Sequence, residues 1–174
     1  LLSMLRDSHA KVLLVSADML ATMKDIESAL LQEFAARLVA VDFEAEGWVH
    51  WREWTRQSQA GWVSPAAAPA QDFNIIYSSG TTGTPKGILH KHDMRWRQAS
   101  RRSFGLDTGS VMLLSTPIYS NTTLQPLLAA ISAGATVVLM SKFNAGRYLQ
   151  LCQQHKVTHT MLVPVQYQRI LDDP

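Results

Sequence analysis

The stretch Tyr77-Ser78-Ser79-Gly80-Thr81-Thr82-Gly83-Thr84-Pro85-Lys86-Gly87 decides the interpretation of this chain. It lies between two strand-like runs, Asp72 to Tyr77 and Gly87 to His90. Its glycines permit positive φ and a close backbone approach to a ligand, and consecutive loop N–H groups can form an anion-binding nest. Four hydroxyls and a lysine add further donors. The stretch therefore predicts a loop that binds polyphosphate, although the same residue types also form ordinary turns.

This loop differs from the common P-loop of nucleotide hydrolases. The P-loop ends in Gly-Lys followed by Ser or Thr, and it opens into a helix. Here Lys86 follows Pro85, which has no N–H, and precedes Gly87, which has no hydroxyl for Mg²⁺. Ser78 and Ser79 also lack the G-x-S-x-G setting of a hydrolase nucleophile. The residues thus disfavour both a P-loop NTPase and a serine hydrolase.

Helical and extended patterns alternate on both sides of the loop. The run 11–16 is short, apolar and rich in branched residues, which is typical of a buried strand. Further strands are expected over 38–42, 72–77, 111–115, 135–140 and 158–162. Between them we expect helices, one with Asp18 as its N-cap and one over 92–104. Thr122 and Gln125 have capping-box spacing, and Gly134 can end that helix in the left-handed conformation. The pattern predicts an α/β fold with a mainly parallel sheet flanked by helices.

Composition excludes several other classes of protein. The 174 residues are 47% hydrophobic and 17% charged, with a formal net charge of +2, which excludes a disordered or fibrous chain and does not favour nucleic acid as a partner. No apolar run approaches the roughly 18 residues that cross a membrane. The single cysteine, Cys152, excludes an internal disulfide and fits a reducing, cytoplasmic compartment. The pairs His90/His92 and His155/His159 have no acidic or cysteine residue to complete a zinc site.

Two further groups of residues carry weaker signals. Trp48, Trp51 and Trp54 would form one aromatic stripe on a helix. We interpret the stripe as an anchor packed on the core, with a ligand platform as the alternative. A basic run also follows the loop, which we interpret as a solvated helix face, with a phosphate-bearing ligand such as coenzyme A or an acidic partner as alternatives. Its members are Lys91, Arg95, Arg97, Arg101 and Arg102.

On these residues the sequence resembles the adenylate-forming (AMP-binding) superfamily, which includes acyl-CoA synthetases, peptide-synthetase adenylation domains and luciferases. Tyr77 to Gly87 is similar to the phosphate-binding loop of that family at each position. Further similar segments are 7–14, 115–119, 134–139 and 158–164. The resemblance implies that residues 1–174 are an incomplete N-terminal AMP-binding domain. We divide it into a βαβ-containing segment (1–60), a linker (61–71), and a phosphate-loop and acyl-pocket segment (72–174).

The resemblance also implies a two-step reaction. A carboxylate attacks the α-phosphorus of ATP to give an acyl-adenylate and pyrophosphate, and a thiol, usually of coenzyme A, then takes the acyl group. Lys86 and Thr81 would be catalytic, with Lys86 neutralising the leaving pyrophosphate. Thr81 or Thr82 would lie near Mg²⁺. The nucleotide-binding residues would be Ser78, Ser79, Gly80, Thr81, Thr82, Gly83, Thr84 and Lys86.

The resemblance places the acyl pocket further along the chain. Tyr119, Asn121 and Val163 would approach the carboxylic acid substrate. Many family members carry a histidine after the aromatic residue, but here Tyr119 is followed by Ser120 and Asn121. Small polar groups thus replace a bulky ring at the pocket.

The remaining landmarks of the family would lie beyond Pro174. They are the ribose-binding aspartate, the hinge and the C-terminal lid domain with its catalytic lysine. We therefore expect this chain to be a piece of a longer acyl-CoA synthetase, inactive by itself, with exposed apolar surface that favours self-association. The alternatives are an adenylation domain that loads a carrier protein, and a non-catalytic nucleotide-binding or interaction module.

Overall fold

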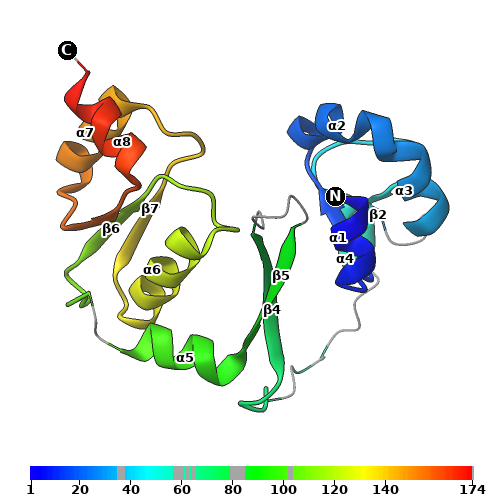
Figure 1. Cartoon of the computed structure of the whole chain (residues 1–174), viewed down its shortest axis with the longest axis horizontal. Helices are drawn as coiled ribbons and strands as arrows, with labels where there is room; N and C mark the ends of the chain where they lie inside the picture. Colours follow the sequence, from blue (N-terminus) through cyan, green and yellow to red (C-terminus); the bar gives the residue numbers. More distant parts are fainter. Residues whose placement is uncertain are drawn as a thin grey trace. The chain divides into compact units, whose positions relative to one another are not determined.

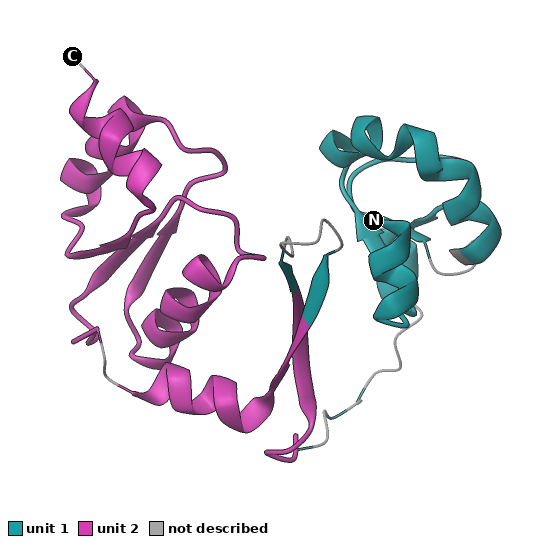
Figure 2. Ribbon diagram, in the orientation of Figure 1, with its two compact units in different colours: residues 1–66, 77–87 teal, residues 67–76, 88–174 magenta. Residues whose placement is uncertain are grey.

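The computed structural model describes residues 1–34, 38–56, 61, 63, 66–78, 85–101 and 104–173. It divides into two compact units, which Figure 2 shows in different colours. Unit 1 comprises Leu1–Ala66 and Tyr77–Gly87, and unit 2 comprises Ala67–Ile76 and Ile88–Pro174. Figure 1 labels most of the helices and strands, numbered in chain order.

Unit 1 is built on a parallel three-stranded sheet in the order β1-β2-β3. Leu14 of β1 lies opposite Val39 of β2, which in turn lies opposite Val49 of β3. The helical segments between β1 and β2 make this a βαβ unit, as the sequence predicts. The elements are α1 (Leu2–Asp7), β1 (Leu13–Val15), α2 (Ala17–Met23), a 3₁₀ turn (Lys24–Ile26), α3 (Glu27–Phe34), β2 (Leu38–Ala40), β3 (Val49–His50) and α4 (Trp51–Arg56).

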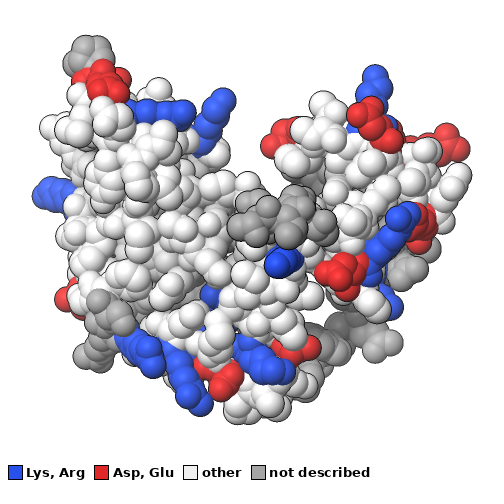
Figure 3. Space-filling model, viewed as in Figure 1, with Lys and Arg blue, Asp and Glu red and all other residues white. Residues whose placement is uncertain are grey.

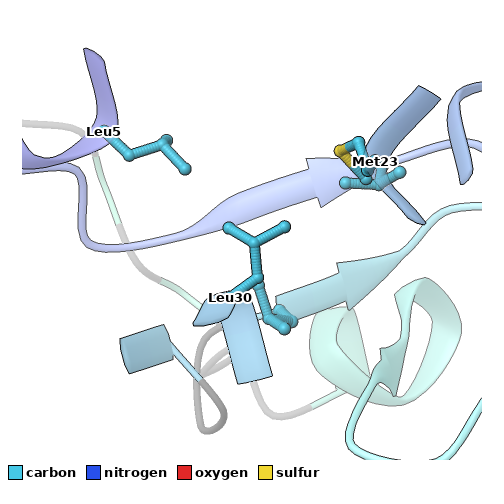
Figure 4. Packing of buried hydrophobic residues seen from close by; sticks show 5 residues of the cluster. Leu5, Met23 and Leu30 are labelled. Carbon is cyan, nitrogen blue, oxygen red and sulfur yellow. The ribbon is translucent and has the colours of Figure 1, made fainter. Parts of the chain in front are cut away.

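Leucine and methionine side chains form the core of unit 1. Leu5, Met23 and Leu30 come from three different helices and lie around the short strands, as the close-up in Figure 4 shows. Leu30 and Leu38 are fully buried. Because burial of each such side chain contributes about 1.5–3 kcal/mol, this cluster can hold strands of only two or three residues in place.

The start of α2 differs from the sequence-based prediction. Its N-cap is Ser16 and not Asp18, which lies in the first turn. The first free N–H of the helix, on Ala17, donates to Asp42 Oδ1 at 2.7 Å. Asp42 follows β2, so a side chain from the next strand satisfies a helix end that the local sequence leaves open.

The prediction that Trp48, Trp51 and Trp54 form one helical stripe packed on the core is also wrong in part. Trp51 and Trp54 share α4, with ring centroids 5.5 Å apart. Trp48 precedes β3, so it lies outside the helix, and it packs edge-on against Phe43 at 5.2 Å. Only Trp48 packs against the core of unit 1, whereas Trp51 and Trp54 are 38% and 37% exposed.

Unit 2 contains a second parallel sheet, in the order β7-β6-β8. The central strand β6 alternates between two apolar clusters. Met112 and Leu114 pack with alanines of α6, while Leu113 packs with Tyr148 and Leu151 of α7. Because successive side chains of a strand point to opposite faces, α6 and α7 cover the two sides of this sheet. The elements are β6 (Val111–Leu114), α6 (Asn121–Ser132), β7 (Thr136–Leu139), α7 (Ala145–His155), β8 (His159–Met161) and α8 (Pro164–Leu171).

Threonine hydroxyls join β8 to β6 in addition to the backbone ladder. Thr158 Oγ1 accepts a hydrogen bond from the N–H of Val111 at 2.9 Å. Thr160 Oγ1 donates to the carbonyl of Leu113 at 3.0 Å and accepts from Tyr148 Oη at 2.9 Å. These contacts fix the pairing of β6 with β8.

A two-stranded sheet, β4 (Asp72–Ser78) with β5 (Lys86–Lys91), precedes the second parallel sheet in the chain. Helix α5 (His92–Ser100) follows β5 directly and is shorter than the predicted 92–104. The N-cap of α6 is Ser120, so the capping box predicted at Thr122 is wrong. Gly134 follows α6 with φ of 72°, as predicted. Within the described ranges, no helix combines the length and the apolar character needed to cross a bilayer.

Candidate functional site

The predicted phosphate loop connects β4 to β5. Ser78 is the last residue of β4 and Lys86 is the first residue of β5, and both side chains are exposed. The ammonium of Lys86 has no hydrogen-bond or ion-pair partner among the described residues, so it is available to an anion. Six predicted site residues lie outside the described residues: Ser79, Gly80, Thr81, Thr82, Gly83 and Thr84. Their roles in phosphate and magnesium binding stay a prediction.

Tyr77 anchors the strand end that leads into the loop. Its hydroxyl lies 2.5 Å from Asp7 Oδ2 and 3.1 Å from the carbonyl of Met4. The hydrogen bond to the Asp7 carboxylate raises the pKa of Tyr77 above its usual value, with burial as a smaller cause. The residue before Ser78 is therefore tied to the end of α1 within unit 1.

Two of the predicted acyl-pocket residues follow the carboxyl ends of neighbouring parallel strands. Tyr119 lies after β6 and is 79% exposed, and Val163 lies after β8 and is half-buried. In open α/β sheets, ligands bind at this edge. Gln166 connects the two strand ends, because its Nε2 donates to Ser115 Oγ at 3.2 Å and its Oε1 accepts from Val163 N–H at 3.2 Å. The structure thus brings the segments after β6 and β8 to one edge of the sheet.

Asn121, the third predicted pocket residue, is the first residue of α6 and is bound by a buried arginine. Arg95 Nη2 donates to Asn121 Oδ1 at 2.8 Å, and Arg95 Nε donates to Asn74 Oδ1 at 3.1 Å. A third bond runs from Arg95 Nη1 to Gln98 Oε1 at 3.0 Å. Arg95 is only 3% exposed, and burial lowers the pKa of its guanidinium.

This burial corrects the interpretation of the basic run as one solvated helix face. Lys91, Arg97 and Arg101 are exposed, and Figure 3 shows lysine and arginine side chains gathered over α5. Lys91 pairs with Asp72 at 3.1 Å, and Arg97 pairs with the Asp one helical turn before it at 3.3 Å. Arg102 lies outside the described residues. Arg95 alone among the described members of the run is directed into the unit.

His90, next to Arg95 in unit 2, was also missed as a buried polar group. It is 4% exposed, and its Nδ1 has no hydrogen-bond partner within the described part of the chain. Burial lowers the pKa of His90, and the charge of Arg95 lowers it further. Asn74, a polar residue between Phe73 and Ile75 of β4, was a local sign that this part of the strand faces polar groups. The structure shows no cluster of three or more His, Cys, Asp or Glu residues able to hold a metal among those it describes.

Comparison with known proteins now identifies the family. A family model described as AMP-binding enzyme matches residues 1–174. The chain belongs to the AMP-binding enzyme family. The resemblance inferred from Tyr77 to Gly87 is confirmed, and so is the α/β fold with parallel sheets flanked by helices.

Individual members of this family show how much of a whole protein the chain represents. It is 31% identical to indoleacetate–CoA ligase of Aromatoleum aromaticum over 178 aligned residues, which cover 98% of the chain and 34% of that relative. It is 29% identical to 4-coumarate–CoA ligase 2 of Solanum tuberosum over 166 residues, which cover 90% of the chain and 29% of that relative. The chain thus spans about a third of the length of the curated relatives it matches.

A solved structure shows the same fold. The inhibitor-bound crystal structure of the N-terminal domain of FACL13 from Mycobacterium tuberculosis superimposes with a TM-score of 0.77. The sequence identity is 21%, and the match covers 99% of this chain and 42% of that one. At this identity the likeness establishes the fold, which is that of part of an N-terminal domain.

Proposed function

We propose that the protein containing this chain is an acid–thiol ligase that forms AMP. It would activate a carboxylic acid with ATP to an acyl-adenylate and then transfer the acyl group to coenzyme A. Membership of the AMP-binding enzyme family and the two CoA ligases described above support this proposal. The observation that carries it is the exposed ammonium of Lys86, which has no partner among the residues that the structure describes, at the point where the glycine- and hydroxyl-rich loop joins β5.

In this proposal the residues of the loop position the phosphates of ATP. Backbone N–H groups and hydroxyls from Ser78 to Thr84 would hold the β- and γ-phosphates, and the Lys86 ammonium would neutralise the charge of the leaving pyrophosphate. The hydroxyl of Thr81 or Thr82 is a hard oxygen ligand of the kind that Mg²⁺ accepts alongside phosphates and water. Bound Mg²⁺ would share with Lys86 the neutralisation of pyrophosphate.

For the acid, we infer an aromatic carboxylic acid as the substrate class. The two relatives compared above are named for indoleacetate and 4-coumarate, which both carry a ring. Ser120 and Asn121, which follow Tyr119, are small polar residues and would leave room for such a ring. The carboxylate would be placed in line with the α-phosphorus, which lowers the entropic part of the barrier.

Acid-dependent pyrophosphate exchange by the full-length protein tests this proposal. We expect exchange with indole-3-acetate or 4-coumarate and weaker exchange with decanoate. Lys86→Ala should slow adenylation by roughly 10²- to 10³-fold, the usual effect of removing one preorganised donor at a developing charge. Thioester formation from supplied acyl-adenylate should change much less, because pyrophosphate leaves only in the first half-reaction.

A matched control is available at the other end of the same strand. Lys91 is also exposed, but its ammonium pairs with Asp72, so Lys91→Ala should leave both half-reactions near wild type. Equal losses in both half-reactions of Lys86→Ala would reject the role of Lys86. Absence of exchange with every acid would reject the ligase itself.

A further inference from the structure

We propose that Asp7 is a positioning residue for the triphosphate of ATP, and that it acts through the Tyr77 hydroxyl on the strand end that leads into the phosphate loop. This inference rests on the proposed function, because it concerns the nucleotide site of the same ligase. It assigns a task to an acidic residue that lies 70 positions before Tyr77 in the chain. Asp7, Tyr77 and Lys86 all belong to unit 1, and Figure 2 shows the loop-side ends of β4 and β5 in the colour of that unit.

The loop-side end of the sheet formed by β4 and β5 has few side-chain anchors. This sheet has two strands, and a two-stranded sheet by itself is only marginally stable in water. Among the described residues at this end, 76–78 and 85–88, Tyr77 is the only one whose side chain makes a hydrogen bond. The contact of Tyr77 with α1 therefore governs where this strand end lies in unit 1.

The hydrogen bond between Tyr77 and Asp7 has a charged acceptor. Tyr77 Oη lies 2.5 Å from Asp7 Oδ2 and 3.1 Å from the carbonyl oxygen of Met4. A phenol has one hydrogen to donate, and the shorter distance to a carboxylate assigns that hydrogen to Asp7. The same bond raises the pKa of Tyr77, so the phenol keeps the proton that it donates.

Asp7 is itself fixed within unit 1. It is the last residue of α1, and Leu5 of this short helix is buried in the core cluster of the unit. Arg6 Nε also donates to Glu33 Oε2 at 3.0 Å, which joins α1 to α3. Because Asp7 is an acceptor on a packed helix, the bond to Tyr77 holds the residue before Ser78 in a fixed place.

A fixed strand end favours the binding of a triphosphate. In the proposed site, loop N–H groups and the Lys86 ammonium converge on the β- and γ-phosphates. If the strand end can move, binding must also order it, and the affinity falls by the free energy that this ordering requires. AMP has neither of these phosphates, so its affinity does not depend on this ordering. The ratio of the ATP affinity to the AMP affinity therefore reports on the contact between Tyr77 and Asp7.

The test measures equilibrium binding of ATP with Mg²⁺, and of AMP, to the full-length protein without acid or coenzyme A. Tyr77→Phe removes one oxygen and keeps the ring. It should weaken ATP binding roughly tenfold, the effect of losing one hydrogen bond to a charged group. AMP binding should change by less than about twofold, as expected for an independent site. General damage to the fold would instead weaken both nucleotides and leave the ratio unchanged.

Variants of Asp7 test whether it acts through Tyr77. Asp7→Ala should lower the ratio as far as Tyr77→Phe does, whereas Asp7→Asn keeps an amide oxygen that can accept from Tyr77 and should restore most of the ratio. Adding Asp7→Ala to Tyr77→Phe should lower the ratio no further. The matched controls are Tyr167→Phe on α8 and Asp25→Ala on the 3₁₀ turn, because both side chains are exposed. Both controls should keep the wild-type ratio.

The outcomes separate this inference from the proposed function. A Tyr77→Phe variant with the wild-type ratio would overturn the inference and leave the ligase in place. A loss in Tyr77→Phe that Asp7→Ala does not reproduce would overturn the role of Asp7. If Asp7→Ala does not fold, Asp7→Leu, which keeps the bulk of the side chain, takes its place. If wild type binds neither nucleotide, the proposed function fails, and the inference fails with it.

Discussion

Gln166 provides a test of how the edge formed by the carboxyl ends of β6 and β8 is held together. The side chain is buried, at 5% exposed, and spans from the start of α8 to the residue after β6. Gln166→Met keeps the size and removes three hydrogen bonds of 3.2–3.3 Å, to Ser115 O, Ser115 Oγ and Val163 N–H. These bonds are long, so we take the net contribution of each to stability as about 0.5–1 kcal/mol, which gives about 2 kcal/mol for the three together.

Hydrogen exchange measures this loss locally in the full-length protein. A decrease of about 2 kcal/mol in opening free energy corresponds to roughly 30-fold faster exchange of the amides at 159–166. The KM for the acid should rise as well, because the segments after β6 and β8 would no longer be joined. Gln168→Met, which removes one exposed bond to Asp172, is the control and should change exchange by less than about twofold.

Two results would refute this reasoning. Unchanged protection at 159–166 would mean that Gln166 contributes no net stability to the edge. Faster exchange spread equally over β7 and α7 would mean that the substitution destabilises the whole unit, and that the edge has no special dependence on Gln166.

Two other predictions concern the core. Burial lowers the pKa of His90 below its ordinary 6.5, so the unfolded chain binds the proton more readily. The free energy of unfolding should therefore fall as pH decreases from 7 to 5, and His90→Gln should remove part of that fall, whereas His155→Gln, on the exposed end of α7, should not. Leu113→Ala should destabilise the protein by about 2–5 kcal/mol in chemical unfolding, because Leu113 is fully buried. Leu149→Ala, at a position 47% exposed, should cost much less, and equal costs would contradict the assignment of β6 to the core.

Most strands of the two parallel sheets were predictable because their signal is local, whereas the two-residue strand β3 was missed. A short apolar run bounded by turn residues identifies a buried strand, and helical spacing between two such runs implies a parallel connection. The family resemblance was predictable for the same reason, since Tyr77 to Gly87 carries it in eleven consecutive residues. What these features share is that no distant partner is needed to recognise them.

Errors arose where neighbouring residues compete or where the partner is distant. Ser16 and Asp18 are both good N-caps, as are Ser120 and Thr122, and the sequence does not state which one the backbone selects. The sequence around Arg95 does not distinguish it from Arg97, which is exposed. Its burial depends on amide oxygens 21 and 26 residues away, which no periodicity reveals.

The alternation of β6 between two apolar clusters bears on how this unit reaches its native state. A strand with one polar face finds its register by hydrophobic burial, because a slip of one residue would expose its apolar side. β6 has no such guide, since Met112, Leu113 and Leu114 are apolar and would be buried in either register. The hydroxyls of Thr158 and Thr160, at about 1 kcal/mol for each hydrogen bond, favour the observed alignment of β8 with β6. A shift of β8 by one residue would break both of these bonds, so side-chain hydroxyls contribute here to a choice of register that apolar burial of β6 does not make.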